Sequence, residues 1–310
     1  MRRLTIRHLR YFEALARIGH FGRAAEACSI SQPALSVQIR ELEDLLGAPL
    51  VERGGRRIRL TGLGEEFAAR AHAILGAVDE LEDLGRAAHG PIAGRLRLGI
   101  ISTIAPYLLP AIIKGLSQLY PELDLRPREA ITQNLIEDLT EARLDAAIVA
   151  LPISEPSLEE FPLFKEDFVL VRPIEDAEKP VPSADRLHEM RLLLLEEGHC
   201  FRDQALSVCN ISAASARELM EGSSLSTLVQ MVGAGIGVTL IPSMAIEIEA
   251  RSAAVCVSQL AEPRPTRTIG MVWRKTSPLT AQFTEVAEVV RDICLAKMTS
   301  IIETSGKPVN

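Results

Sequence analysis

The chain has 310 residues, which is enough for two or three domains. Hydrophobic residues make up 47% and charged residues 24%, a globular balance that excludes wholesale disorder. The net charge of -7 argues against a nucleic-acid partner, but the charge is unevenly distributed. Residues 1–60 hold 11 Arg against 6 Asp or Glu, whereas the rest of the chain holds 23 basic and 35 acidic groups. The sequence therefore predicts a basic binding module on an acidic body.

The sequence does not predict export or a membrane span. The basic first residues are not followed by the continuous apolar segment of a secretory signal. The most apolar stretch, residues 228–246, is interrupted by Gln230, three glycines and Pro242. Five cysteines in a chain of this length do not indicate a disulfide framework. We expect a cytoplasmic protein with no membrane partner.

The first 60 residues have the pattern of a winged helix-turn-helix. Helices are expected over residues 5–17 and about 22–28, and a third helix begins after its cap at Ser31. Residues 50–60 alternate and carry Arg on both sides of two glycines, which is typical of a short β wing. The apolar stripe of the third helix is Leu35, Ile39, Leu42 and Leu46. Two helices, a short turn and a basic wing together indicate DNA binding.

The candidate DNA-contacting residues are those of the third helix that fall outside its apolar stripe, together with wing arginines. They are Ser31, Gln32, Pro33, Ser36 and Arg40, with Arg53 and Arg56 on the wing. Gln pairs well with adenine, and Arg with guanine or phosphate. The alternative is an ordinary solvated helix face, and Glu41, Glu43 and Asp44 are expected to form such a face.

Residues 63–90 predict one long helix with a heptad seam. The seam residues are Phe67, Ala71, Ile74, Val78 and Leu81. The helix either packs on its own chain or pairs two chains. Pairing is favoured directly after a DNA-reading unit, because dimers match two half-sites.

The remaining chain alternates strands and helices, which predicts an α/β region with a parallel, doubly wound sheet. Strands are expected over 96–100, 123–128, 146–151, 168–171, 192–195, 238–241 and 268–273, and helices over 110–119, 134–144, 225–233 and 279–297. Thr103 and Thr132 follow the first two strands, where small ligands bind in such sheets. Their hydroxyls would hold a ligand or cap the helices that follow, and capping is the more common role.

A cysteine segment stands out in the second half of the chain. Cys200 lies between His199 and Arg202, and Gly198 opens a helical segment that places Cys200 near a helix N-terminus. Cationic neighbours and a helix N-terminus both favour the thiolate, which is the form that attacks a peroxide. Cys209 is the nearest possible partner thiol.

The spacing of these two cysteines has a physical consequence. In a continuous helix their Cα atoms would be about 13.5 Å apart, whereas a disulfide needs about 4.4–6.8 Å. A Cys200–Cys209 bond therefore requires the helix to unwind, which would make it a conformational switch. The alternative is that both cysteines are buried structural thiols. A metal site formed by His199 and both thiols is weaker, because the spacing matches no common zinc pattern.

The N-terminal segment resembles the LysR-type transcriptional regulators. The matching residues are Ala24-Ala25-Glu26, Ser31 to Ser36, Ile39 to Glu43, Leu46-Gly47, Leu50 to Arg53, Leu60-Thr61 and Gly64. The resemblance implies a multidomain chain: an N-terminal winged helix-turn-helix (residues 1–62), a dimerising linker helix (63–90), and an α/β regulatory domain with two lobes like those of periplasmic binding proteins. Lobe I would comprise residues 95–164 and 268–303, and lobe II residues 165–267 with both cysteines.

Within that family, the cysteine segment resembles the members that sense hydrogen peroxide. The match extends from Gly198 to Cys209 and to the segments around Thr103, Thr132 and Arg267. It implies that Cys200 is the peroxidatic thiol and Cys209 the resolving thiol. A peroxide pocket of Thr103, Thr132, His199, Arg202 and Asp203 is also implied, with no cofactor or metal.

The resemblance further implies a set of partners. They are double-stranded DNA, hydrogen peroxide, RNA polymerase, a thioredoxin- or glutaredoxin-type reductant, and copies of the chain that assemble from a homodimer to a homotetramer. The chain would then not be an enzyme. Two rival interpretations are a regulator that senses a small organic acid between its lobes and a thiol peroxidase.

Overall fold

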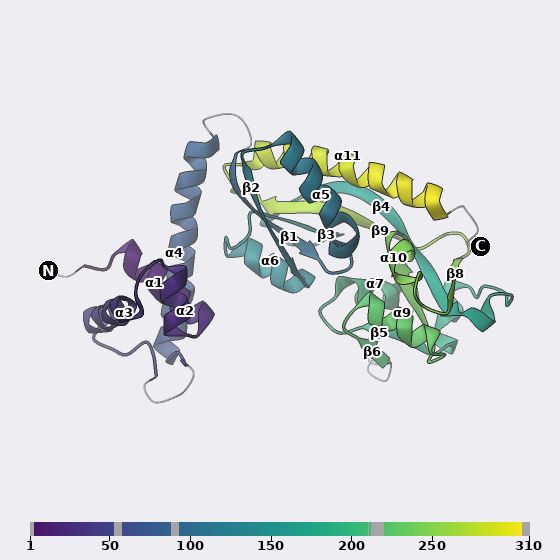
Figure 1. Cartoon of the computed structure of the whole chain (residues 1–310), viewed down its shortest axis with the longest axis horizontal. Coiled ribbons are helices and arrows are strands. Elements are labelled where there is room, and N and C mark those ends of the chain that lie inside the picture. Colours follow the sequence, from purple (N-terminus) through teal and green to yellow (C-terminus); the bar gives the residue numbers. More distant parts are fainter. Residues whose placement is uncertain (1–2, 53–57, 88–92, 210, 212–219, 306–310) are drawn as a thin grey trace. The chain divides into compact units, whose positions relative to one another are not determined.

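The computed structural model describes all residues except 1–2, 53–57, 88–92, 210, 212–219 and 306–310. The chain divides into two compact units, residues 1–85 and 86–310 (Figure 1). Among the described residues, no helix combines the length and hydrophobicity that a membrane crossing needs.

The first unit is helical. Its helices are α1 (Ile6–Ile18), α2 (Phe21–Ala27), α3 (Gln32–Leu46) and α4 (Gly62–Ala87). Thr5 caps α1 as the sequence predicts, and Gly19 ends it in the left-handed conformation at φ 66°. Phe12, Leu15, Leu35 and Leu42 are fully buried among these helices and form the centre of the core.

The wing predicted over residues 50–60 is present as a short antiparallel bridge between Val51 and Leu60. Arg53 and Arg56 lie outside the described residues. Glu43, which we expected to be solvated, is buried and accepts hydrogen bonds from the backbone N–H groups of Leu50 and Val51 at 2.8 and 3.1 Å. That expectation was wrong because the chain after α3 folds back over the Glu43 side chain.

The apolar seam of α4 is divided between two environments. Phe67 packs edge-on against Phe12 of α1 at 5.4 Å between ring centroids, and Ala71 is buried. Ile74 and Leu81 are 45% and 67% exposed. The first part of the seam therefore packs on its own chain, while the second part is apolar surface. Leu46 of α3, predicted to lie on the buried stripe, is likewise exposed because α3 ends there at Gly47.

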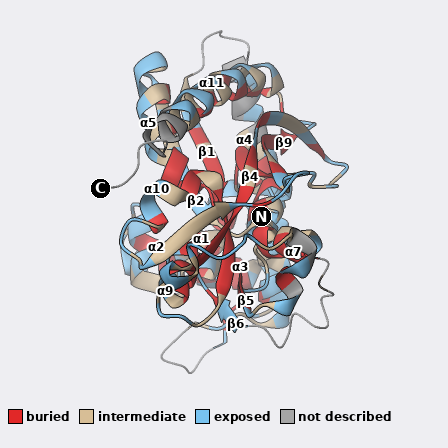
Figure 2. Ribbon diagram, turned by 90° about the vertical axis from the view of Figure 1, so that its right-hand side faces the viewer, coloured by how far each residue is buried: buried red, intermediate tan, exposed pale blue. Residues whose placement is uncertain are grey.

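The second unit is an α/β unit with one continuous path of strands. The strands are β1 (Gly94–Ile101), β2 (Leu123–Ala130), β3 (Ala146–Leu151), β4 (Leu158–Pro173), β5 (Leu192–Leu195), β6 (Met220–Gly222), β7 (Val238–Pro242), β8 (Val255–Gln259) and β9 (Thr266–Arg274). Their order is β2-β1-β3-β9-β4-β7-β5-β6, and β8 pairs with β4. These strands carry most of the buried residues of the unit (Figure 2).

The sheet is mixed, and the expectation of an all-parallel sheet was wrong. β1 pairs in parallel with β2 and β3, and β5 with β6 and β7. β9 and β4 run antiparallel to their neighbours. β4 begins at Leu158, ten residues before the predicted strand, because its first part pairs with β9 and its last part with β7 and β8. This long strand therefore joins the two lobes.

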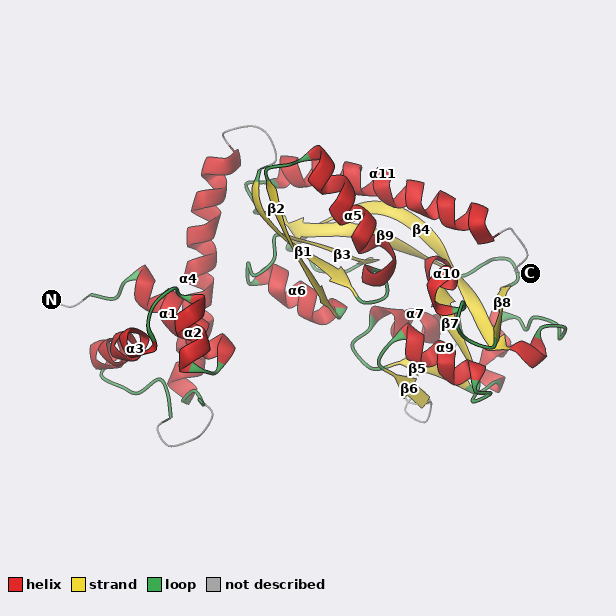
Figure 3. Cartoon of the chain, in the orientation of Figure 1, coloured by secondary structure: helices red, strands yellow, loops and turns green. Residues whose placement is uncertain are grey.

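Helices cover both faces of the strands (Figure 3). They are α5 (Ala105–Leu119), α6 (Thr132–Thr140), α7 (Cys200–Val208), α9 (Leu225–Gly233), α10 (Ile246–Glu249) and α11 (Thr280–Ser305), with short 3-10 turns at Ile174–Asp176, Ala184–Glu189 and Ser243–Ala245. α11 packs on α5, where Gly115 leaves room for Ile293. α6 and α7 belong to different lobes, and the first residues of both line a common pocket.

Candidate functional site

α7 carries the two cysteines at its two ends. It follows β5 through a turn in which Gly198 has φ +94°, a conformation that favours glycine. Cys200 is the first residue of the helix and is partly exposed. Cys209 ends the helix and is fully buried. Both are free thiols.

The continuous helix keeps the two thiols apart. α7 has nine residues, and Cys209 lies nine positions after Cys200, so their Cα atoms are separated by about 13.5 Å. This exceeds the disulfide range by roughly a factor of two. Burial raises the pKa of the Cys209 thiol to about 12, so Cys209 stays protonated and inert while the helix is intact.

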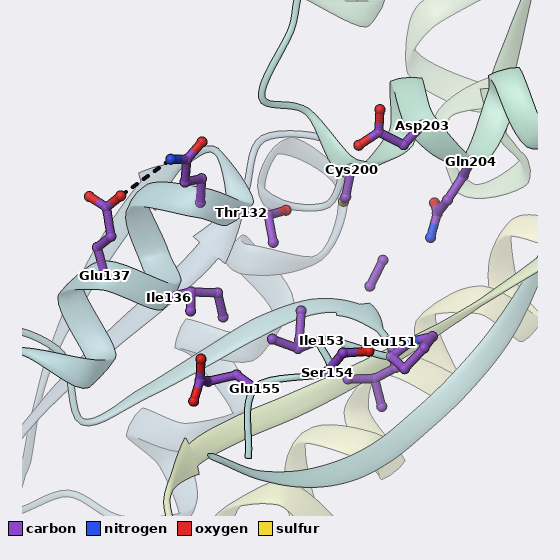
Figure 4. Close-up of a pocket in the computed structure, with 13 residues that line it drawn as sticks. Thr132, Ile136, Glu137, Leu151, Ile153, Ser154, Glu155, Cys200, Asp203 and Gln204 are labelled. Atoms are coloured by element: carbon purple, nitrogen blue, oxygen red, sulfur yellow. Dashed lines mark hydrogen bonds between the residues drawn. The ribbon is translucent and has the colours of Figure 1, made fainter. Parts of the chain in front are cut away.

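A pocket of about 490 Å³ lies between the lobes, beside the first turn of α7. Its lining comes from the start of α6, the end of β3 with the loop after it, and α7: Thr132, Gln133, Ile136, Glu137, Ala150, Leu151, Pro152, Ile153, Ser154, Glu155, Cys200, Asp203 and Gln204. Cys200 and Gln204 project from α7 toward Leu151 and Ile153 (Figure 4). Of the five residues that the resemblance assigned to a peroxide pocket, Thr132 and Asp203 line this one, together with Cys200, the predicted peroxidatic thiol.

Two polar atoms in the pocket wall are buried without a hydrogen-bond partner. They are Thr132 Oγ1 and Gln204 Oε1. Thr132 does not cap α6, since Ile131 occupies the cap position with no side-chain bond, so the expectation of capping was wrong for this residue. The cap position of α7, His199, also makes no side-chain capping bond. Buried polar groups normally have partners, so these two oxygens are available to a small polar molecule in the pocket.

Thr103 does not line this pocket, and its hydroxyl already has a hydrogen-bond partner. Its side chain is buried, and its Oγ1 accepts a hydrogen bond from Arg267 Nη1 at 2.9 Å. Arg267 also donates to Glu166 at 2.6 Å, and its guanidinium lies 5.1 Å from the centre of the Phe201 ring. The expectation that Thr103 caps α5 was therefore wrong, because Arg267 takes its hydroxyl. Thr103 is linked to α7 through Arg267 and Phe201.

The two cationic neighbours expected to act on Cys200 have other roles. Arg202 is buried and donates to the Leu195 carbonyl at 2.8 Å, and it pairs with Glu221 at 2.6 Å, so it anchors α7 to β5 and β6. His199 Nδ1 lies 3.2 Å from Ser102 Oγ. Burial lowers the pKa of His199, which favours the neutral imidazole. Neither side chain lines the pocket.

Some features of the site could not be read from the sequence. The sequence analysis missed Gln204 as a pocket residue. Its position four residues after Cys200, on the same helix face, was the signal that could have identified it. Arg267 gave no sign of its buried ion pair with Glu166. The close contact between Gly198 and Ile131 was also not foreseen: a Cβ on Gly198 would lie 2.7 Å from Ile131 Cδ1. This contact fixes the start of α7 against the start of α6.

The candidate DNA-reading residues lie on α3 in the first unit. Ser31 caps the helix by accepting from the Ala34 N–H at 3.3 Å. Gln32, Pro33 and Arg40 are exposed, and Ser36 is half-buried. Arg40 Nε donates to the Ser36 carbonyl at 3.2 Å. Gln32, Pro33 and Arg40 are therefore accessible on α3, whereas Leu35 and Ile39 are buried in the core.

Two family models match the chain. The model described as the bacterial regulatory helix-turn-helix protein of the lysR family matches residues 6–65, and the LysR substrate binding domain matches residues 89–295. The chain belongs to the LysR family. The first match spans α1 to α3 and the start of α4, and the second spans most of the α/β unit.

Relatives of this LysR-family protein share nearly its whole length. A probable hydrogen peroxide-inducible genes activator of Streptomyces viridosporus is 41% identical over 94% of this chain and 95% of its own. Full-length OxyR from Pseudomonas aeruginosa, solved as a point variant, has a TM-score of 0.72 at 36% identity, covering 94% of this chain and 96% of that one. A hydrogen peroxide-bound OxyR mutant from Corynebacterium glutamicum has a TM-score of 0.68 at 32% identity, covering 100% and 98%.

The described part of this LysR-family chain offers no evident metal centre. No group of three or more His, Cys, Asp or Glu side chains is arranged there to hold an ion. His199 and Cys200 lie at one end of α7 and Cys209 at the other, so the weak zinc interpretation has no geometric support.

Proposed function

We propose that the protein is a DNA-binding transcriptional regulator that senses hydrogen peroxide through a thiol–disulfide switch between Cys200 and Cys209 and controls oxidative-stress genes. One observation carries this proposal. A partly exposed cysteine lies in a pocket with unpartnered polar atoms, and a buried cysteine closes the same nine-residue helix. A single local unfolding event, the unwinding of α7, would bring the second thiol to the first.

The chemistry balances within the chain and its oxidant. The Cys200 sulfur attacks one peroxide oxygen, the S–O bond forms as the O–O bond breaks, and water leaves once the departing oxygen has taken up protons. Cys200 becomes a sulfenic acid. The released Cys209 thiolate then attacks this sulfur, the S–O bond breaks, a second water leaves and the disulfide forms.

Each site residue has a proposed part in this sequence. Thr132 and Gln204 offer buried oxygens as hydrogen-bond acceptors for the peroxide O–H groups, and Asp203 lines the same pocket from α7. Thr103 and His199 act at the edge of the site, through Arg267 and Ser102 respectively. Arg202 holds α7 on the lobe II strands, and unwinding would free it.

Disulfide formation would be transmitted to DNA through the assembly. We place Ser31, Gln32, Pro33, Ser36 and Arg40 at the major groove, with Arg53 and Arg56 on the wing. The exposed Ile74 and Leu81 of α4 support pairing of two chains, and dimers that associate to a tetramer would span successive half-sites. The altered complex would change its contacts with RNA polymerase, and a thioredoxin- or glutaredoxin-type reductant would reduce the disulfide again. The protein would act as a regulator in the cytoplasm, without a resident cofactor.

The test is thiol mapping after stoichiometric hydrogen peroxide. Reduced wild type, Cys200→Ser and Cys209→Ser are treated in parallel and analysed by mass spectrometry, with Cys256→Ser as the matched control for a partly exposed cysteine outside α7. We expect a Cys200–Cys209 disulfide in wild type and in the control, and none in the other two. Thiols that stay reduced would refute the switch.

The pocket charge argues against the rival organic-acid sensor. Glu137, Glu155 and Asp203 line it, and none of its described lining residues is Arg, Lys or His. A carboxylate ligand would lack a cationic partner there. The thiol peroxidase alternative predicts sustained peroxide turnover with reductant and no change in a DNA footprint, so footprinting of reduced and oxidised protein separates it from the regulator.

A further inference from the structure

The pocket is far larger than its proposed ligand. Its volume is about 490 Å³, whereas a water molecule occupies about 30 Å³ in the liquid and hydrogen peroxide has only one oxygen atom more. Thr132 and Gln204, whose side-chain oxygens have no hydrogen-bond partner, line the pocket from α6 and α7. Most of the pocket volume is therefore not needed to hold hydrogen peroxide.

One wall of this space is apolar. Ile136 on α6 and the run from Leu151 to Ile153 after β3 face the α7 residues Cys200 and Gln204 (Figure 4). Such a wall solvates an alkyl group better than water does. The geometry around Cys200 therefore does not restrict the oxidant to the smallest peroxide.

The charges of the pocket all have one sign. The carboxylates of Glu137, Glu155 and Asp203 line it, with no cationic side chain among the described lining residues. The Ser157 N–H and hydroxyl donate to Glu155 and hold its pKa below the usual range, so it remains ionised at neutral pH.

Three arginines of the two lobes pair with carboxylates of their own. Arg202 pairs with Glu221 at 2.6 Å, and Arg267 pairs with Glu166 at 2.6 Å. The Arg128 guanidinium, on β2 beside α6, pairs with Asp138. The described side chains that line the pocket therefore carry only negative charge, while the N-termini of α6 and α7 add partial positive charge next to Thr132 and Cys200.

We propose that this pocket selects the oxidant by charge and not by size: neutral hydroperoxides, including short alkyl hydroperoxides, reach Cys200, and anionic peroxides are held back. The inference rests on the proposed function, because it concerns the oxidant of the same switch. With an alkyl hydroperoxide the S–O bond forms as the O–O bond breaks. Cys200 is oxidised to the sulfenic acid and the alcohol leaves after taking up a proton. The Cys209 step is unchanged.

The expected size of the effect follows from electrostatic focusing. A cleft lined by one sign of charge changes the approach rate of a charged ligand by about 10- to 1000-fold. Because Glu137 and Asp203 are exposed and Glu155 is partly exposed, we expect at most the lower end of that range, and salt should reduce the effect over a Debye length of about 8 Å.

The experiment compares oxidants of different charge on the full-length reduced protein. Second-order rate constants for Cys200 oxidation are measured with hydrogen peroxide, tert-butyl hydroperoxide and the peroxymonosulfate anion, each divided by its rate constant with free cysteine. The test variant is Glu137→Gln/Glu155→Gln. The control is Glu247→Gln/Glu288→Gln, which removes the same charge from exposed positions outside the pocket.

We expect tert-butyl hydroperoxide to produce the Cys200–Cys209 disulfide in wild type. The peroxymonosulfate-to-hydrogen peroxide rate ratio should rise at least about fivefold in the test variant and stay constant in the control. Added salt should raise the same ratio in wild type. No disulfide with the alkyl hydroperoxide, or an equal ratio in both variants, would overturn the inference. Failure of hydrogen peroxide itself to oxidise Cys200 would overturn the proposed function instead.

Discussion

Glu166 and Arg267 are direct partners in the antiparallel pairing of β4 with β9, at the point where both segments pass between the lobes. Their ion pair measures 2.6 Å, and the two side chains are 0% and 1% exposed. Arg267 also holds Thr103 of lobe I and lies over Phe201 of α7. One buried guanidinium thus connects the crossing strands, the first lobe and the redox helix.

Removal of the Glu166 charge should strongly destabilise the folded protein. Glu166→Gln leaves Arg267 buried without a counter-charge, and we expect a loss of about 3–5 kcal/mol in the free energy of unfolding. Urea denaturation measures this loss. The matched control is Glu189→Gln, which removes a carboxylate from the exposed pair with Arg186 and should cost under about 1 kcal/mol. Equal losses in both variants would refute the buried pair as an anchor.

Gly198 should resist substitution for two separable reasons. In Gly198→Ala the residue at φ +94° is strained, and its Cβ meets Ile131 Cδ1 at 2.7 Å. Gly235→Ala, at φ +76° with nothing within 4 Å, carries only the strain of about 1–2 kcal/mol. We expect Gly198→Ala to be less stable than Gly235→Ala and also to change the Cys200 oxidation rate. Adding Ile131→Ala should restore part of that rate, and no restoration would argue against the contact.

Alkylation should distinguish the two redox thiols. Cys200 is partly exposed in the pocket, whereas Cys209 is fully buried with its pKa raised to about 12. At about pH 8, iodoacetamide should label Cys200 in the reduced protein and leave Cys209 unlabelled until denaturant is added. Cys294, which is also buried with its pKa raised to about 12, is the internal control. Labelling of Cys209 as fast as Cys200 would show that α7 is already open.

Acid should weaken the contact between Ser102 and His199. Burial lowers the pKa of His199 below its ordinary value of 6.5. At pH values between the lowered pKa and 6.5, the unfolded chain therefore binds more protons than the folded chain. Stability therefore rises with pH in that window and falls on acidification through it. The free energy of unfolding, measured against pH, should show this slope in wild type and lose it in His199→Gln. If the slope persists in the variant, other titratable groups cause it.

Helix propensity at Ser207 should tune the redox potential. Ser207 is exposed near the end of α7, and Ala favours a helix over Gly by about 1 kcal/mol. If disulfide formation unwinds α7 as we propose, only the reduced form benefits from helix propensity, and Ser207→Ala should have a potential about 20 mV above that of Ser207→Gly. Glutathione titration measures the difference. Ala296→Gly, on the exposed face of α11, should leave the potential unchanged. A similar shift there would contradict the unwinding step.

Much of the local structure was predictable because its causes are local. Thr5 and Ser31 cap helices, Gly19 ends one, and the strand 192–195 and the helix 225–233 fall within or at their predicted bounds. Cys200 lies at a helix N-terminus as predicted, because Gly198 supplies the turn before it. These features depend on neighbours within a few residues.

Other parts depended on segments distant in the sequence. β4 begins at Leu158 because β9, about a hundred residues later, pairs with its first part, and this pairing makes the sheet mixed. Arg202 is turned to Glu221 and Thr103 to Arg267, although the sequence places Arg202 beside Cys200. Glu43 is buried by the wing that follows it.

The sequence by itself determined the kind of protein: a basic helix-turn-helix on an acidic two-lobed body, with two cysteines nine residues apart on one helix. The tertiary structure decided how the site works. It selected which side chains line the pocket, left Thr132 and Gln204 unpartnered there, and engaged the nearby cations elsewhere. Helical spacing is fixed by the local backbone, whereas burial and ion pairing depend on chain segments that only folding brings together.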